Sequence, residues 1–349
     1  MHGRQIRNAL FALVITGLIP LVTLPSVYAQ ETESEFAAAV RAYRQQNYAA
    51  AFEGFKKLAR QGDRDSQTYL GLMYAEGQGI DEDIEEAIKW YLRAADQEHP
   101  DAQYWLGHIS QNGLGVKQDR ETAAAWFHLA AENGHSEAQF SLAMLYTDGE
   151  GAPKDHKQAV TWFTKAAVQG HVHAQHNLGV LLMSGEGVDQ DAYQAASWFK
   201  QAAEQGHVDA QYNLGAMFAD GIGISKDDAK AVLWLRRAAE SGLADAQAGL
   251  GRMAYEGVGM AKSYDESAYW FRLAANQGHP EAQFFMSALT AKGEGVPEDP
   301  IESFMWLSLA KSQGINDKAL EDELKTVLTP EQMIAARERA KEWQKMMRN

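Results

Sequence analysis

Residues 138–170 read AQFSLAMLYTDGEGAPKDHKQAVTWFTKAAVQG, and this stretch decides the fold because its pattern recurs along the chain. One tryptophan marks each copy, and neighbouring copies are 36 residues apart. The tryptophans are Trp90, Trp126, Trp162, Trp198, Trp234, Trp270 and Trp306. A Gly-x-Gly pair and a glutamine keep the same spacing in all seven copies. We call each set of equivalent positions, 36 residues apart, a column. Three columns in register predict a tandem-repeat protein, in which each unit packs against its neighbours.

The first half of each unit predicts a helix. Ala102, Leu106 and Ile109 lie at i, i+4 and i+7, an apolar stripe with helical spacing. The residue after the leucine column is always small, which indicates close approach by another helix. These residues are Gly71, Gly107, Ala143, Gly179, Gly215, Gly251 and Ser287. The Gly-x-Gly pair then ends the helix, because glycine adopts the left-handed C-cap conformation at little cost.

The second half of each unit predicts another helix with its own start signal. N-cap residues precede it at Asp83, Asp119, Asp155, Asp191, Asp227, Ser263 and Asp299. In five copies an acid or amide three residues later suggests a capping box: Glu86, Gln158, Gln194, Glu266 and Glu302. The buried stripe, exemplified by Ala123, Trp126, Phe127 and Ala130, assigns the tryptophans to the core rather than to a sugar-stacking ladder.

The chain divides into a leader, a degenerate first unit, seven repeats and a terminal cap. The expected domains are a signal peptide at 1–29, an N-terminal capping repeat at 30–64, and C-terminal capping helices at 317–349. The repeats are expected at 65–100, 101–136, 137–172, 173–208, 209–244, 245–280 and 281–316. Capping units are what a solenoid needs to stay soluble.

The first residues resemble a secretory signal. Arg4 and Arg7 precede an apolar run at 9–24, and Val27-Tyr28-Ala29 then places small residues where a signal peptidase cuts. Cleavage after Ala29 would make the protein periplasmic or secreted. The alternative is an uncleaved membrane anchor, which the shortness of the run and Pro20 disfavour.

The composition of the chain limits the classes of partner and of binding site that it can have. The formal charge of −15 argues against nucleic acid, because phosphate neutralisation needs clustered basic residues. The chain has no cysteine, which excludes disulfides and thiolate metal sites. We expect a monomer with a protein or extended peptide partner and no membrane span after signal removal.

The columns resemble those of the Sel1-like repeat (SLR) family, relatives of the tetratricopeptide repeats. The pattern is A-Q-x-x-L-G, then Y-x-x-G-x-G, then D-x-x-x-A-x-x-W-[FY]-x-x-A-A-x-x-G, and it covers residues 65–316. The resemblance implies an all-α, right-handed α/α superhelical solenoid that acts as an adaptor, often in the bacterial envelope. Cysteine-rich members have been linked to β-lactam binding, which we do not carry over to a chain without cysteine.

Three patterns suggest chemistry, and each has a plainer explanation. The Gly-x-Gly pairs lack the strand and longer motif of a phosphate-binding loop. Ser197-x-x-Lys200 and Ser308-x-x-Lys311 match a serine–lysine acylation motif without its partner motifs. His171, His173 and His176 could bind a divalent metal, but their spacing fixes no fourth ligand. We therefore expect no catalytic residues, no metal and no cofactor.

Function is expected where the repeats differ. On the first helix the positions at i, i+3 and i+7 vary most, and they share one helical face. The predicted partner-binding residues are Tyr69, Leu72, Trp105, His108, Met144, Asn177, Asn213, Arg252 and Phe285. They would form a groove for a protein or peptide bound by a scaffold in the cell envelope. The alternative is a glycan or cell-wall-fragment binding module, with Tyr69, Tyr104, Trp105 and Phe285 stacking on sugars.

Overall fold

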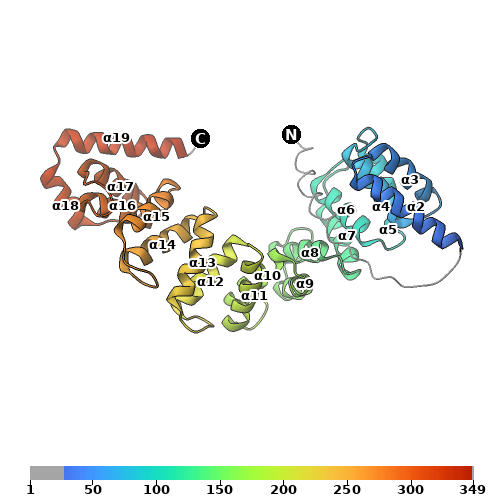
Figure 1. The fold of residues 1–349 in the computed structure, drawn as a ribbon, viewed down its shortest axis with the longest axis horizontal. Helices are drawn as coiled ribbons and strands as arrows, with labels where there is room; N and C mark the ends of the chain where they lie inside the picture. Colours follow the sequence, from blue (N-terminus) through green and yellow to red (C-terminus); the bar gives the residue numbers. More distant parts are fainter. Residues whose placement is uncertain (1–26, 348–349) are drawn as a thin grey trace. The chain divides into compact units, whose positions relative to one another are not determined.

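The computed structural model describes residues 27–347, which form eighteen helices and no strand (Figure 1). The signal sequence predicted for residues 1–29 lies outside this range, apart from its last three residues in the first described helix. The chain divides into two compact units, one ending at His171 and the other beginning at Val172. No helix within the described range combines the length and apolarity needed to cross a membrane.

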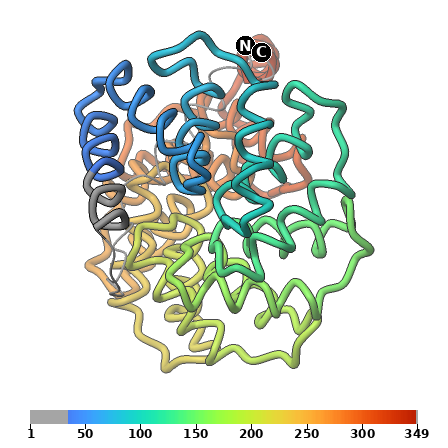
Figure 2. Tube along the Cα trace, turned by 90° about the vertical axis from the view of Figure 1, so that its right-hand side faces the viewer, coloured from blue at the N-terminus to red at the C-terminus, as the bar shows by residue number. Residues whose placement is uncertain are grey.

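The first unit contains two N-terminal helices and three repeats. Its helices are α2 (Val27–Arg44), α3 (Tyr48–Arg60), α4 (Arg64–Glu76), α5 (Ile84–Ala95), α6 (Pro100–Asn112), α7 (Arg120–Glu132), α8 (Ser136–Asp148) and α9 (His156–Val168). Consecutive helices within this unit pack against each other, and Figure 2 traces the unit from blue to green.

The second unit contains four repeats and the C-terminal helices. Its helices are α10 (Val172–Ser184), α11 (Ala192–Glu204), α12 (Val208–Asp220), α13 (Asp228–Glu240), α14 (Ala244–Glu256), α15 (Tyr264–Asn276), α16 (Pro280–Lys292), α17 (Pro300–Ser312), α18 (Lys318–Val327) and α19 (Pro330–Met347). Consecutive pairs again pack as repeats, and α19 returns against α17. These pairs confirm the predicted all-α architecture of helix-turn-helix units.

All seven predicted N-caps start their helices, but the predicted capping boxes are only half formed. In the sixth repeat Ser263 accepts a hydrogen bond from the Glu266 amide (3.2 Å), and its own amide donates to Ala254 of the preceding helix (2.9 Å). That amide is therefore not available to the Glu266 carboxylate, which instead accepts from the Trp270 indole (3.4 Å). The prediction of reciprocal boxes was wrong for the repeats, because the tight interhelical turn already satisfies the N-cap amide.

The core forms where the small-residue column meets the second helix. A Cβ added to Gly107 would lie 2.7 Å from the Phe127 ring, which confirms the predicted close approach. Five of the seven column tryptophans are at most 8% exposed, and Trp126 and Trp198 are half-buried. In six of the seven Gly-x-Gly pairs the second glycine also contacts the preceding unit, since a Cβ on Gly259, for example, would clash with the Asp228 carbonyl oxygen.

Candidate partner-binding face

Buried glutamines join each repeat to the one before it. In the sixth repeat the Gln247 side chain donates to the Ala239 carbonyl at the end of α13 (3.1 Å). Its oxygen accepts from the Gln277 side chain at the end of α15 (2.8 Å). Equivalent donor bonds are made by Gln67, Gln103, Gln139, Gln211 and Gln283. The glutamine column therefore satisfies helix-end carbonyls at the junctions and belongs to the fold.

The histidine column forms a second set of links. His279 caps α16, because its Nδ1 accepts from the Ala282 amide (3.2 Å) while its Nε2 lies 3.2 Å from the Asp245 carboxylate of the preceding repeat. A neutral imidazole with its proton on Nε2 satisfies both partners. His99 repeats the arrangement with Asp65 (2.9 Å), and this hydrogen bond lowers the pKa of the Asp65 carboxyl.

One junction departs from this pattern. His173 stands where other repeats have an acid, so Nε2 of His207 faces Nδ1 of His173 at 3.2 Å. His176 stacks on the same ring, with centroids 4.4 Å apart. Burial and these two neighbouring imidazoles lower the pKa of His207 to about 4. His171 instead pairs with Glu137 (3.0 Å), and no group of three or more potential metal-ligand side chains occurs in residues 27–347.

The residues predicted to bind a partner are placed at different depths. Leu72 and Trp105 are buried, each 9% exposed. Arg252 is exposed. The other six, Tyr69, His108, Met144, Asn177, Asn213 and Phe285, are half-buried. The binding role of all nine stays a prediction.

The aromatic side chains of the glycan alternative are already engaged with other rings. Tyr69 stacks on Phe55, and Phe285 stacks on Phe271, each with centroids 4.5 Å apart. Tyr104 stacks on His135 at 4.6 Å. A sugar ring stacks on an open aromatic face, and one face of each of these three rings is covered.

The second unit has a hollow on the side of its first helices. It has a volume of about 200 Å³ and lies among α12, α14 and α16, with Leu235 of α13 contributing to the lining. Arg252 lines it, as do residues of the variable columns such as Asp220 and Gly249. We refer to it as the α14 hollow, and to the side of the first helices that carries the variable columns as the first-helix face.

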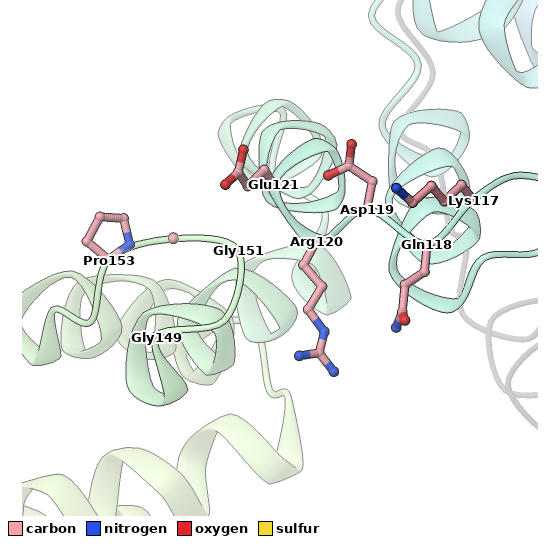
Figure 3. Close-up of a pocket in the computed structure, with 9 residues that line it drawn as sticks. Lys117, Gln118, Asp119, Arg120, Glu121, Gly149, Gly151 and Pro153 are labelled. Atoms are coloured by element: carbon pink, nitrogen blue, oxygen red, sulfur yellow. The ribbon is translucent and has the colours of Figure 1, made fainter.

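A larger, more open depression lies in the first unit, between interhelical loops rather than on the first-helix face (Figure 3). Two of its charged side chains already have structural roles, since Asp119 caps α7 and Arg120 pairs with Glu150 at 2.9 Å. We therefore do not take it as the candidate site.

The serine–lysine pair at 308 and 311 also has structural contacts. The Ser308 hydroxyl donates to the Phe304 carbonyl (2.7 Å), and the Lys311 ammonium pairs with Glu321 (2.6 Å). The Lys311 pair joins α17 to α18, whereas the Ser308 bond lies within α17.

Sequence reasoning missed the amide partners of the glutamine column. Gln97, Asn133, Gln169, Gln205, Gln277 and Gln313 each donate to a column glutamine. They follow the same 36-residue spacing, so a fourth aligned column was available as the signal. It also missed the N-cap role of the histidines, because histidine is not a common cap.

The fold defines a class: a tandem helical-repeat protein. The sequence model of the Sel1 repeat family matches residues 64–99, 100–135, 136–171, 172–207, 208–243, 244–279 and 280–315. The chain belongs to the Sel1 repeat family, whose members are generally scaffolds for protein interactions. Each match begins one residue before the repeat boundaries predicted above.

A solved structure shows the same fold. A Sel1 repeat protein from Oxalobacter formigenes is 31% identical, covering 90% of this chain and 99% of that one, with a TM-score of 0.59. The uropathogenic Escherichia coli protective antigen c5321, described as displaying an SLR fold, is 26% identical over 90% of this chain and 84% of that one, with a TM-score of 0.46. The search of curated proteins found no match.

Proposed function

We propose that this protein is an exported, non-catalytic scaffold that holds a protein or an extended peptide against the first-helix face of its repeats in the cell envelope. The observation that carries the proposal is that recurring and varying residues have different structural roles within each repeat. Column residues that recur are buried or make junction bonds, as Gln247 does, whereas exposed first-helix positions such as Val180, Asp220 and Arg252 differ between copies.

The first-helix face favours a protein partner over a glycan. Three of the four aromatic rings named for sugar stacking are covered on one face by other rings, and Trp105 is buried. The α14 hollow mixes apolar and charged lining, which suits amino-acid side chains. Scaffolding is also the general role of the family.

A capture experiment from envelope extract tests the binding role. We define the face variant as Val180→Lys with Asp220→Lys, two exposed positions of first helices. The matched outer variant is Val168→Lys with Glu204→Lys, two exposed positions of second helices that receive the same charge change. The scaffold proposal expects a protein on the wild type and outer variant, and loss of that protein from the face variant. Retention of polysaccharide alone, or equal capture by both variants, would contradict it.

Export is tested separately. N-terminal sequencing of the protein from fractionated cells is expected to begin at Gln30 in the periplasm or medium. A cytoplasmic protein that still carries the segment before Ala29 would contradict export while leaving the binding role open to the capture test.

A further inference from the structure

The α14 hollow exists because three small residues replace larger ones. Gly249 occupies the column that holds Tyr69, Trp105 and Phe285 in other repeats. Ala248 and Ala216 likewise replace the aromatic or long side chains found in some other copies of their columns. A Cβ at Gly249 would meet only Leu235 side-chain atoms, 3.7 Å and 3.9 Å away, so the space in front of this glycine is open. Glycine inside a helix costs stability relative to alanine, and here it leaves room on the first-helix face.

The lining combines an apolar wall with an acidic rim. Leu235, Ala248 and Met253 form part of the wall. Asp220, Asp245 and Glu281 stand around it, and Arg252 is its one arginine or lysine. The rim therefore carries a net negative charge when His279 is neutral.

The rim carboxylates are only partly neutralised by their neighbours. Arg252 lies 3.7 Å from Glu281, a long and exposed pair that gains little in water. Asp245 lies 3.2 Å from Nε2 of His279, and a neutral imidazole there donates a hydrogen bond without adding a positive charge. Asp220, at the end of α12, is exposed and makes no ion pair within the described residues.

These carboxylates converge on Tyr212, which also lines the hollow. Burial raises the pKa of the Tyr212 hydroxyl first, and Asp245, Glu281 and Asp220 raise it further against the opposing effect of Arg252. The space beside Tyr212 thus has a negative potential, which favours a cation and disfavours an anion.

We propose that the α14 hollow binds the side chain of a lysine or an arginine presented by an extended segment of the partner. The aliphatic stem packs on Leu235, Ala248 and Met253, and the cationic end reaches the rim beside Asp220 and Tyr212. Long basic side chains suit such a site because they bury their methylenes while keeping the charge among polar groups. This inference rests on the proposed function and assigns a chemical class to the partner.

The test uses small probes, so it needs no identified partner. The full-length secreted protein is labelled with 13C at its methionine methyl groups, and Met253 reports on the hollow. The probes are N-acetyl-lysine N-methylamide, N-acetyl-arginine N-methylamide and the uncharged N-acetyl-norleucine N-methylamide. We expect a saturable shift of the Met253 methyl signal with one or both cationic probes, with a dissociation constant on the order of millimolar, and at most a tenth of that shift with norleucine.

Two variants locate the binding. Gly249→Leu fills the hollow and Asp220→Asn removes a rim charge, and both are expected to abolish or weaken the lysine or arginine shift at least threefold. Asp148→Asn, at the equivalent position two repeats earlier, is the matched control and is expected to leave the shift unchanged. An equal response to norleucine, no saturable response to either cation, or a response that survives Gly249→Leu overturns the assignment. Failure here, with a protein still captured through the first-helix face, would reject the basic-residue site and retain the scaffold.

Discussion

The junctions between repeats and the first-helix face are built from the same helices. Residues at the junctions recur from repeat to repeat, whereas residues on the first-helix face vary. At the junctions the same residues make the same bonds, as Gln103 and Gln247 each do with an alanine carbonyl eight residues earlier. On the first-helix face the equivalent positions of successive repeats include Tyr69, Gly249 and Phe285. Repetition therefore marks the residues that hold the junctions, and variation marks positions without a shared junction role, whose exposed members we propose recognise a partner.

The junctions also differ among themselves, which shows what each link contributes. At the regular junctions a histidine faces an acid and a glutamine accepts from an amide, as for His279 with Asp245 and Gln283 with Gln313. In the second unit several of these links are absent, and Leu243 in the histidine column makes no side-chain cap. His207 faces His173 instead of an acid, and Ser241 is too short to reach Gln211, whose buried Oε1 has no hydrogen-bond partner among the described residues.

The largest expected effect comes from the core that both regions share. Phe271 is fully buried, stacks on Phe285 and packs against Gly251. Phe271→Ala is expected to lower the free energy of unfolding by about 3–5 kcal/mol, because it removes buried surface and leaves a cavity. Urea unfolding measures the loss, and Arg272→Ala at the neighbouring half-exposed position is expected to change it by less than about 0.5 kcal/mol. Similar losses for both variants would contradict the assignment of this column to the core.

A broken glutamine link should cost less. Gln247→Leu keeps the approximate volume but removes two hydrogen bonds, one to the Ala239 carbonyl and one from the Gln277 amide. Each of these groups keeps another partner in Gly242. We therefore expect a loss of about 1–2 kcal/mol in urea unfolding, the net worth of one or two ordinary hydrogen bonds. Gln201→Leu, at an exposed position of α11, is the control. If Gln247→Leu lowers the free energy of unfolding no more than the control does, the glutamine column does not stabilise the junctions.

The irregular histidine junction predicts a pH dependence. His207 has a folded pKa of about 4 against 6.5 for an ordinary histidine, so it is neutral in both states at neutral pH. As the pH falls from 6.5 towards 4 the unfolded chain binds a proton that the folded chain rejects, and stability is lost. After allowance for partial exposure we expect a loss of about 1 kcal/mol from this group.

His173→Asp should reduce that dependence, because it removes one of the two neighbouring imidazoles while the burial of His207 remains. The new carboxylate would face His207 as Asp65 faces His99, and it would favour the protonated ring in the folded state. Urea unfolding at pH 7.5 and pH 5 is expected to show a smaller difference for His173→Asp than for the wild type, and an unaltered difference for the exposed His128→Gln. An undiminished acid loss in His173→Asp would rule out the His173–His207 pair as its source.

The smallest effect should be a gain. Ser241→Gln supplies the amide that the Gln211 Oε1 lacks, as Gln205 does for Gln175. We expect stability to rise by about 0.5–1 kcal/mol, the net worth of an ordinary hydrogen bond. Differential unfolding in urea measures it, and a loss of stability would mean that the gap at this junction is not caused by the short serine.

Periodicity alone predicted much of the fold. The N-caps from Asp83 to Asp299 and the small residues such as Gly107 lie where the pattern places them, because capping and close packing depend on local residue type. The bonds across junctions were not predicted, since Gln247 and Ala239 meet through helix packing that spacing alone does not specify. The same limit applied to the site. The varied columns indicated the first-helix face, but the burial of Trp105 and the opening at Gly249 depend on neighbouring repeats.

The most direct test of the division between junction and face is the dissociation constant of the captured partner for three proteins: the wild type, the face variant and Ser241→Gln. Isothermal titration calorimetry measures binding, and urea unfolding of the same samples measures stability. We expect the face variant to bind at least tenfold more weakly, about 1.4 kcal/mol, with its stability within about 0.5 kcal/mol of the wild type. Ser241→Gln should bind as the wild type does while being more stable. Unchanged binding by the face variant, or weakened binding by Ser241→Gln, would contradict the account.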